Sequence, residues 1–390
     1  MKLVKKIIKA LFNPSSTYSI IPPLLSYLYK GLPLYNLKRF WLKNRSNLNL
    51  DNELIKMIDY FIQSKSYKRM SNHWHYDSIK NISQIIESDL QNYSTTIARN
   101  YYTWVDIYDV HVEQTMLNVQ TISASDKINI YKKQINMSYV DSMKYNNLTN
   151  LIYLNLKKLN LLDKLNFLSD EGYLSYNDPF IDINGYKISQ DKVNSILDYN
   201  SINDFSSLSS KKSILEIGAG SGRTSQAILT FNDNIKYTIC DIPPALYLSY
   251  DRLKKVFKNK KIGLLYNLSE DELNNQINNY DISFIMPHQV DFIKSIKYDL
   301  TIGINCFHEM DKKTIKNYIS NINNISKLFY FTVWKSHYTR HSKLFYATSN
   351  KMDYFANDYN IPKNWVKSYE KELIFPSCFI GAGFKIDKTK

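Results

Sequence analysis

The stretch Ser213-Ile-Leu-Glu-Ile-Gly-Ala-Gly-Ser-Gly-Arg223 decides the fold. It begins as a short apolar run typical of a buried parallel strand and continues with glycines at positions 218, 220 and 222. Glycines let a backbone turn sharply and approach a ligand closely. Apolar residues then recur at helical spacing over 224–231, so the stretch predicts a strand, a glycine loop and a helix. Because an acid is costly to bury without a partner, we expect Glu216 at the exit of the strand.

Further strands and helices alternate downstream of this stretch. Apolar runs predict strands at 235–241, 282–286, 300–304 and 328–333, and helical periods predict helices at 245–257 and 312–325. This alternation indicates an α/β fold with a Rossmann-like, mostly parallel sheet whose ligand lies at the carboxyl ends of the strands. Residues 373–386 predict a closing antiparallel hairpin.

The upstream part of the chain is expected to be mainly helical. Helical periods recur at 54–62 and 148–159, and residues 1–165 therefore predict a helical N-terminal region that caps the substrate or mediates oligomerisation. Alternation around Asn184-Gly185 predicts a hairpin, followed by a helix capped by Ser189 or Asp191. Residues 166–390 form the second expected domain.

Composition limits the class of protein. A chain of 390 residues can hold two domains, and its formal charge of +14 invites nucleic-acid binding. The lysines are scattered through predicted helices, which disfavours that interpretation. The three cysteines, Cys240, Cys306 and Cys378, have no paired spacing, so they predict neither a disulfide framework nor a zinc site and favour a reducing cytosol.

The N-terminus is not expected to carry a targeting signal. No run of about 18 apolar residues predicts a transmembrane helix. Lysines interrupt the apolar stretch 1–12, which argues against a signal peptide. This stretch predicts either a helix docked on its own domain or a basic amphipathic helix at the inner, anionic face of a membrane. The expected location is cytoplasmic.

Two cofactors compete for the glycine loop. A dinucleotide loop needs a third glycine at the sixth position, but Arg223 or Ser225 stands there. The acid followed by three alternate glycines instead resembles the first motif of class I S-adenosylmethionine-dependent methyltransferases. That resemblance implies S-adenosyl-L-methionine as cofactor, with Asp241 on its ribose and Glu216 near its amino group. Capping of the helix after Pro243-Pro244 is the structural alternative for Asp241.

The resemblance implies a full set of cofactor contacts. The expected members are Glu216, Gly218, Ala219, Gly220, Gly222, Arg223, Asp241, Ile242 and His288. His288 follows the third predicted strand and is expected either to adjoin the adenine or to be a loop histidine with no role.

A narrower resemblance covers residues 165–390. Residues 214–224, Asp241-Ile-Pro-Pro-Ala245, Phe307-His-Glu-Met310 and the Asn-Gly junction are similar to a family of sugar O-methyltransferases from bacterial surface-glycan loci. This similarity implies a carbohydrate acceptor that is free, nucleotide-linked or lipid-linked.

The catalytic candidates follow the fourth predicted strand. His308 is the expected base, since a histidine's ordinary pKa of about 6.5 suits proton removal from a hydroxyl near neutrality. Glu309 is expected to orient it, bind sugar hydroxyls or ligate a metal, provided that the chain turns there. Asp311 is expected to cap the next helix. His73-Trp74-His75 lacks a third ligand at useful spacing, which favours a structural or substrate-side role over a metal.

Two other functions fit parts of the sequence. RNA methylation would suit the charge, but the Asn/Asp-Pro-Pro-Tyr motif of amino-group methyltransferases is absent, and Cys306 lacks the preceding proline of cytosine-C5 enzymes. A non-catalytic scaffold would not need the intact Glu216, glycines and Asp241. The sequence predicts no oligomeric state.

Overall fold

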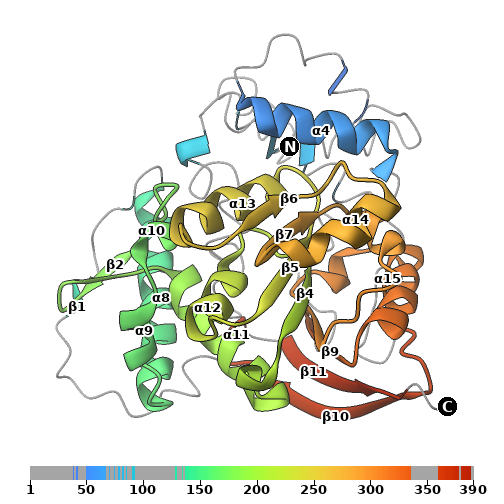
Figure 1. The fold of residues 1–390 in the computed structure, drawn as a ribbon. Helices are drawn as coiled ribbons and strands as arrows, with labels where there is room; N and C mark the ends of the chain where they lie inside the picture. The colour runs from blue at the N-terminus through green and yellow to red at the C-terminus, as the bar shows by residue number, and fades with distance from the viewer. Residues whose placement is uncertain are drawn as a thin grey trace, which may run out of the picture.

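The computed structural model describes residues 50–66, 137–334, 359–376 and 379–387, with separate positions within 38–42, 70–92 and 128–134 (Figure 1). The expected N-terminal helix at 1–12 lies outside the described residues, as do His73 and His75. Among the described helices, none is long and apolar enough to cross a bilayer.

An eight-stranded sheet forms the centre of the molecule. Its strands are β4 Ser213–Ile217, β5 Lys236–Cys240, β6 Ile262–Leu264, β7 Ile282–Ile285, β8 Leu300–Ile304, β9 Leu328–Trp334, β10 Trp365–Glu372 and β11 Phe379–Ile386. They lie in the order β10-β11-β9-β8-β4-β5-β7-β6. Neighbours from β6 to β9 are parallel, whereas β11 is antiparallel to β9 and β10. The mostly parallel sheet with an antiparallel C-terminal hairpin is therefore confirmed.

Two details of the sheet differ from expectation. Strand β6 was not predicted, because it has only three residues and a glycine, Gly263, at its centre. The first strand of the C-terminal hairpin begins at Trp365 and ends at Glu372, before the apolar residues that suggested it.

The order of the strands creates a crevice at one edge. From β4 the chain moves to β5 and its neighbours on one side, and then returns to β8 on the other side. The loops that leave β4 and β8 therefore diverge, and ligands of open α/β sheets bind at such a switch point.

Alternate residues of β4 face two different cores. Ile214 belongs to the larger core with α11 Gln190–Ser206, α12 Arg223–Phe231 and α13 Ala245–Val256. Leu215 and Ile217 belong to the second core with α14 Glu270–Gln276 and α15 Lys312–Ile325. Since successive strand residues point to opposite faces, helices cover both sides of the sheet, as Figure 1 shows.

The described part of the N-terminal region is mainly helical. It contains α4 Asn52–Gln63, α8 Tyr139–Lys158 and the start of α9 Asp163–Phe167, and α10 Asp170–Tyr173 follows it. The helical periods at 54–62 and 148–159 are thus confirmed. The boundary expected near residue 165 falls within α9, and the division into two domains stays a prediction.

The expected hairpin joins this region to the sheet. It consists of β2 Ile181–Ile183 and β3 Tyr186–Ile188, and β1 Ile128–Asn129 adds an unpredicted third strand. Asn184 and Gly185 form the turn with φ of 54° and 85°. The Ser189 hydroxyl accepts a hydrogen bond from the Lys192 backbone N–H at 3.2 Å, so Ser189 and not Asp191 caps α11.

Candidate active site

The glycine loop follows β4 with three left-handed residues. Gly218, Gly220 and Gly222 have φ of 70°, 58° and 76°, a region that side chains rarely occupy. At Gly218 a Cβ would lie 2.6 Å from the Cβ of Cys306, so space as well as conformation requires glycine. The Gly218 N–H donates to the Cys240 carbonyl at 2.8 Å, which joins the loop to the end of β5.

Asp241 holds the same loop from the neighbouring strand. Its Oδ2 accepts from the Gly220 N–H and its Oδ1 accepts from the Ile242 N–H, both at 2.7 Å. The N-cap of α13 is Pro244, with no side-chain cap, so Asp241 does not cap that helix. Burial raises the pKa of Asp241 to about 7, although the two backbone N–H groups oppose the rise. The carboxyl therefore titrates near neutral pH.

This titration predicts that ligand affinity depends on pH. A hydroxyl that donates to Asp241 favours the carboxylate, so binding of a ribose should expel the proton. We expect affinity for S-adenosylhomocysteine to fall as the pH drops through about 7 and to level off above it. Calorimetry in two buffers with different ionisation enthalpies measures both the affinity and the proton release. The same shift makes the group's contribution to folding stability most favourable below its ordinary pKa of 3.8, and that contribution is lost as the pH rises through about 7.

Two variants isolate the source of the pH effect. Asp241→Asn removes the titrating group and should flatten the pH dependence as well as weaken binding. Asp299→Asn makes the same chemical change just before β8, where Asp299 accepts from the Lys212 N–H at 2.9 Å, and should leave the pH dependence intact. An unchanged slope in Asp241→Asn would assign the effect to another group.

Glu216 lies inside β4 and not at its exit, which corrects the expectation. It is fully buried, and its Oε2 accepts from the hydroxyls of Ser225 and Tyr237, the latter at 2.8 Å. Burial raises the pKa of Glu216, while the two hydroxyl donors oppose the rise. Partners from α12 and β5 offset part of the burial cost, whereas the buried Oε1 has no hydrogen-bond partner in the described structure. Glu216 thus joins three elements and does not line the pocket described below.

The Arg223 side chain also faces the helices. Its Nη1 lies 2.6 Å from Oδ2 of Asp198, and its Nε lies 4.0 Å from Oδ1 of Asp191. Both acids belong to α11. The structure therefore places the Arg223 guanidinium against α11, outside the pocket lining, and leaves only its backbone at the loop.

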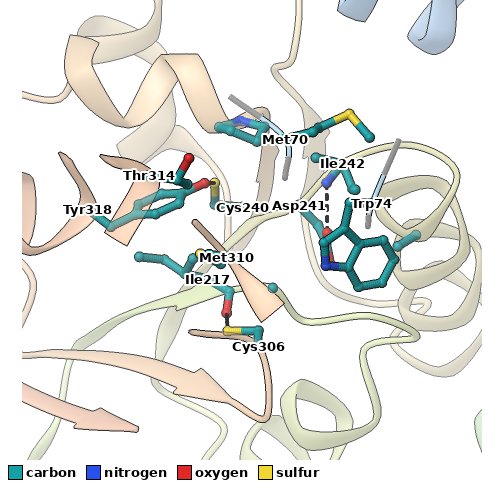
Figure 2. Close-up of a pocket in the computed structure, with 13 residues that line it drawn as sticks. Met70, Trp74, Ile217, Cys240, Asp241, Ile242, Cys306, Met310, Thr314 and Tyr318 are labelled. Atoms are coloured by element: carbon teal, nitrogen blue, oxygen red, sulfur yellow. Dashed lines mark hydrogen bonds between the residues drawn. The ribbon is translucent and has the colours of Figure 1, made fainter. Parts of the chain in front are cut away.

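A pocket opens at the carboxyl ends of the strands (Figure 2). Its empty volume is about 600 Å³, including the part open to solvent. The lining comes from five parts of the chain: Ile217 and Gly218; Cys240, Asp241, Ile242 and Ala245; Pro287; Cys306, Met310, Thr314 and Tyr318; and Met70 and Trp74.

The pocket gathers only some of the expected cofactor residues. Gly218, Asp241 and Ile242 line it, whereas the other six do not. The sequence analysis did not place the side chains from α15 or Met70 at the site, and it expected a structural or substrate-side role for Trp74. The apolar residues at helical spacing in α15 would have suggested one buried face, but not that its first turns reach a ligand. Among the described residues, no group of three or more His, Cys, Asp or Glu could hold a metal ion.

His288 is buried beside the pocket. It lies on a 3₁₀ helix, Pro287–Phe292, that follows β7, and its first residue Pro287 lines the pocket. The imidazole centroid lies 5.5 Å from the Phe292 ring and 5.9 Å from the Tyr60 ring of α4. His288 therefore packs between the sheet and the N-terminal region.

His308 and Glu309 lie on a second 3₁₀ helix, Phe307–Glu309, after β8. The chain turns there, which is the condition under which both side chains could reach one substrate. Nε2 of His308 lies 3.9 Å from Oε1 of Glu309. The imidazole packs edge-on against Phe379 and Trp334, with centroids 5.2 and 5.8 Å away. Neither side chain lines the pocket, but Cys306 and Met310 on either side of them do.

The helix after this turn is capped as expected. Oδ1 of Asp311 accepts from the Thr314 N–H at 2.8 Å, and Asp311 is the N-cap of α15. The cap orients the first turns of α15, from which Thr314 and Tyr318 reach the pocket.

Comparison with known proteins finds only distant structural similarities. No protein-family model matches the chain, and no curated protein matches it. Similar solved structures include the plantazolicin methyltransferase BpumL in complex with SAH (11% identity, 50% of this chain and 84% of that chain, TM-score 0.35). They also include the N-methyltransferase NodS from Bradyrhizobium japonicum WM9 (13% identity, 49% and 93%, TM-score 0.34).

The pyocyanin biosynthetic protein PhzM is another similar structure (11% identity, TM-score 0.34), and the match covers 50% of this chain and 56% of PhzM. Similarities of this size concern the fold and identify neither a substrate nor a family. The protein therefore belongs to the α/β class and has a pocket at the switch point of its sheet.

Proposed function

We propose that the protein is an S-adenosylmethionine-dependent methyltransferase that methylates a hydroxyl oxygen of a sugar. One observation carries the methyl-transfer proposal: Asp241, at the end of the second strand, is hydrogen-bonded to the glycine loop of the first strand and faces a pocket. An acid at this place suits ribose hydroxyls, and a glycine loop at a switch point suits close approach to a cofactor.

The pocket chemistry fits this cofactor. Asp241 is the one carboxylate among the described residues that line the pocket, and each of its oxygens has a second lone pair for a ribose hydroxyl. The remaining lining is largely aliphatic, aromatic and sulfur-containing, which suits an adenine ring and a thioether. When bound, S-adenosylmethionine supplies a methyl group that is already activated on a sulfonium.

The chain's own residues then have two tasks. The first is to align the acceptor hydroxyl with the methyl group. Cys306 and Met310 line the pocket on the side of β8 and limit the positions that the acceptor can take there. The second is to receive the hydroxyl proton, for which we assign the imidazole of His308. Glu309, whose Oε1 lies 3.9 Å from Nε2, stabilises the protonated imidazole. Phe379 and Trp334 hold the ring from the other sides.

The sugar acceptor rests on sequence alone. Residues 214–224, 241–245 and 307–310 carry the similarity to sugar O-methyltransferases, and no contact in the pocket distinguishes a sugar from another hydroxyl compound.

Methyl transfer with two classes of acceptor tests the proposal. The purified full-length protein is incubated with S-adenosylmethionine labelled in its methyl group and with either surface-glycan precursors or RNA. We expect label in the carbohydrate fraction and S-adenosylhomocysteine as co-product. Label in RNA alone would contradict the acceptor, and calorimetry that detects no cofactor binding would contradict methyl transfer altogether.

A further inference from the structure

Two residues from the N-terminal region complete the pocket wall. Met70 and Trp74 line the same pocket as Asp241, although about 170 residues of chain separate Asp241 from them. In Figure 2, both lie on the side of Asp241 and Ile242, while Thr314 and Tyr318 lie across the pocket. Trp74 is partly buried.

Helix α4 attaches this region to the sheet beyond β5. Oε1 of Glu53 accepts a hydrogen bond from the Tyr266 hydroxyl at 2.7 Å. The Tyr60 ring lies 5.8 Å from the Tyr266 ring and 5.9 Å from the His288 ring. Tyr266 follows β6 and His288 follows β7, so α4 is held at the carboxyl ends of these two strands.

These contacts define which part of a cofactor would meet the N-terminal region. The glycine loop follows β4 and Asp241 follows β5, so the direction from the loop through Asp241 leads towards β7 and β6. A ribose held by Asp241 places the base further along this direction. Ile242, Pro287, Met70 and Trp74 are the lining residues there.

We propose that Trp74 is a cofactor-binding residue that stacks on the adenine of S-adenosylmethionine. The inference rests on the proposed function and extends it, because it makes the N-terminal region part of the cofactor site. A flat indole provides apolar contact and face-to-face stacking for a purine, and the Met70 thioether adds a polarisable contact beside it. The adenosine is thereby enclosed between the sheet and a segment that precedes it in the chain.

Calorimetry with two ligands tests the position of Trp74. S-adenosylhomocysteine contains the adenosine and the amino acid, whereas 5′-methylthioadenosine retains the adenosine and lacks the amino acid. We expect Trp74→Ala to weaken both ligands by the same factor, about 10-fold or more, as base–aromatic stacking does when an aromatic side chain is removed. Trp74→Phe should retain affinity within about 3-fold, because a smaller ring still stacks.

Two further variants serve as controls. Trp74→Leu keeps an apolar side chain but lacks a ring, so it should weaken binding nearly as much as Trp74→Ala. It therefore tests the stacking contact even if Trp74→Ala does not fold. Tyr186→Ala removes an aromatic ring that is 60% exposed on the β2–β3 hairpin and should leave both affinities unchanged. Thermal unfolding of each variant without ligand checks that the fold is intact.

Distinct results would overturn the inference and the function. Wild-type binding with unchanged affinity in Trp74→Leu would remove Trp74 from the site and leave the proposed function standing. Weakening of S-adenosylhomocysteine but not of 5′-methylthioadenosine would also overturn it, since the contact would then lie at the amino acid. A wild-type protein that binds neither ligand would remove the proposed function itself.

Discussion

Replacing His308 with glutamine should lower the kcat of methyl transfer by about 10²-fold or more, the usual contribution of a general base. The loss should appear in kcat and not in affinity for S-adenosylhomocysteine, because His308 does not line the cofactor pocket. Its place between Cys306 and Met310, with Glu309 3.9 Å away, suits a proton acceptor at the edge of that pocket. Single-turnover kinetics with saturating cofactor measures the effect.

Chemical rescue distinguishes a base from a structural residue. In His308→Ala, added imidazole should restore part of the rate if the missing group is a proton acceptor, whereas a packing defect against Phe379 and Trp334 would not respond specifically to a base. Full activity of His308→Ala would remove the base assignment.

Replacing Gly218 with alanine should cost about 2–4 kcal/mol of folding stability and abolish measurable cofactor binding. Part of the cost comes from φ of 70°, which disfavours any side chain. The rest comes from close packing, since the new Cβ would lie 2.6 Å from the Cβ and 2.9 Å from the Sγ of Cys306. Relief of this overlap moves the glycine loop away from the pocket wall. Denaturant unfolding and calorimetry measure the two effects.

Gly185 offers a matched control for the backbone effect. Its φ is 85°, but nothing lies within 4 Å of the Cβ that an alanine would add. Gly185→Ala should therefore cost only the conformational part, about 1–2 kcal/mol. The double variant Gly218→Ala with Cys306→Gly should recover some of the stability lost by Gly218→Ala alone. Equal losses in the two single variants would refute the packing account.

The sheet could be predicted because its signals are local. Each of the five expected parallel strands is an apolar run, and helical periods separate several of them, so periodicity alone locates both. Strand β6 was not predicted, because a strand of three residues around Gly263 is too short to show a hydrophobic period. The left-handed turn at Asn184-Gly185 could be predicted because Asn and Gly are the residue types that most readily adopt the positive φ angles of a tight hairpin turn.

The site was harder to predict because its contacts join distant segments. The burial of Glu216 depends on hydroxyls from Ser225 and Tyr237, which the sequence of β4 itself does not predict. Arg223 stands in the glycine motif, yet Asp198 on an earlier helix determines where its guanidinium lies. Asp241 was located correctly at a strand end, but its hydrogen bond to Gly220 follows from the pairing of two strands.

The role of Trp74 was also hard to predict from the sequence. Its neighbours His73 and His75 drew attention to a possible metal, whereas the pocket is lined by the tryptophan between them. The sequence favours a structural or substrate-side role over a metal for this segment, but the residue type alone does not indicate which ligand Trp74 would meet.

The distribution of the pocket lining along the chain affects how the protein folds. The lining extends from Met70 to Tyr318, so its parts meet only after loops of many residues have closed. Such long-range contacts slow folding, since loop-closure entropy is lost before the contacts form. A ligand that binds only the assembled pocket stabilises the native state by mass action, more so as its concentration exceeds its dissociation constant. Cellular supply of the ligand would then influence not only turnover but also the fraction of newly made chains that escape proteolysis.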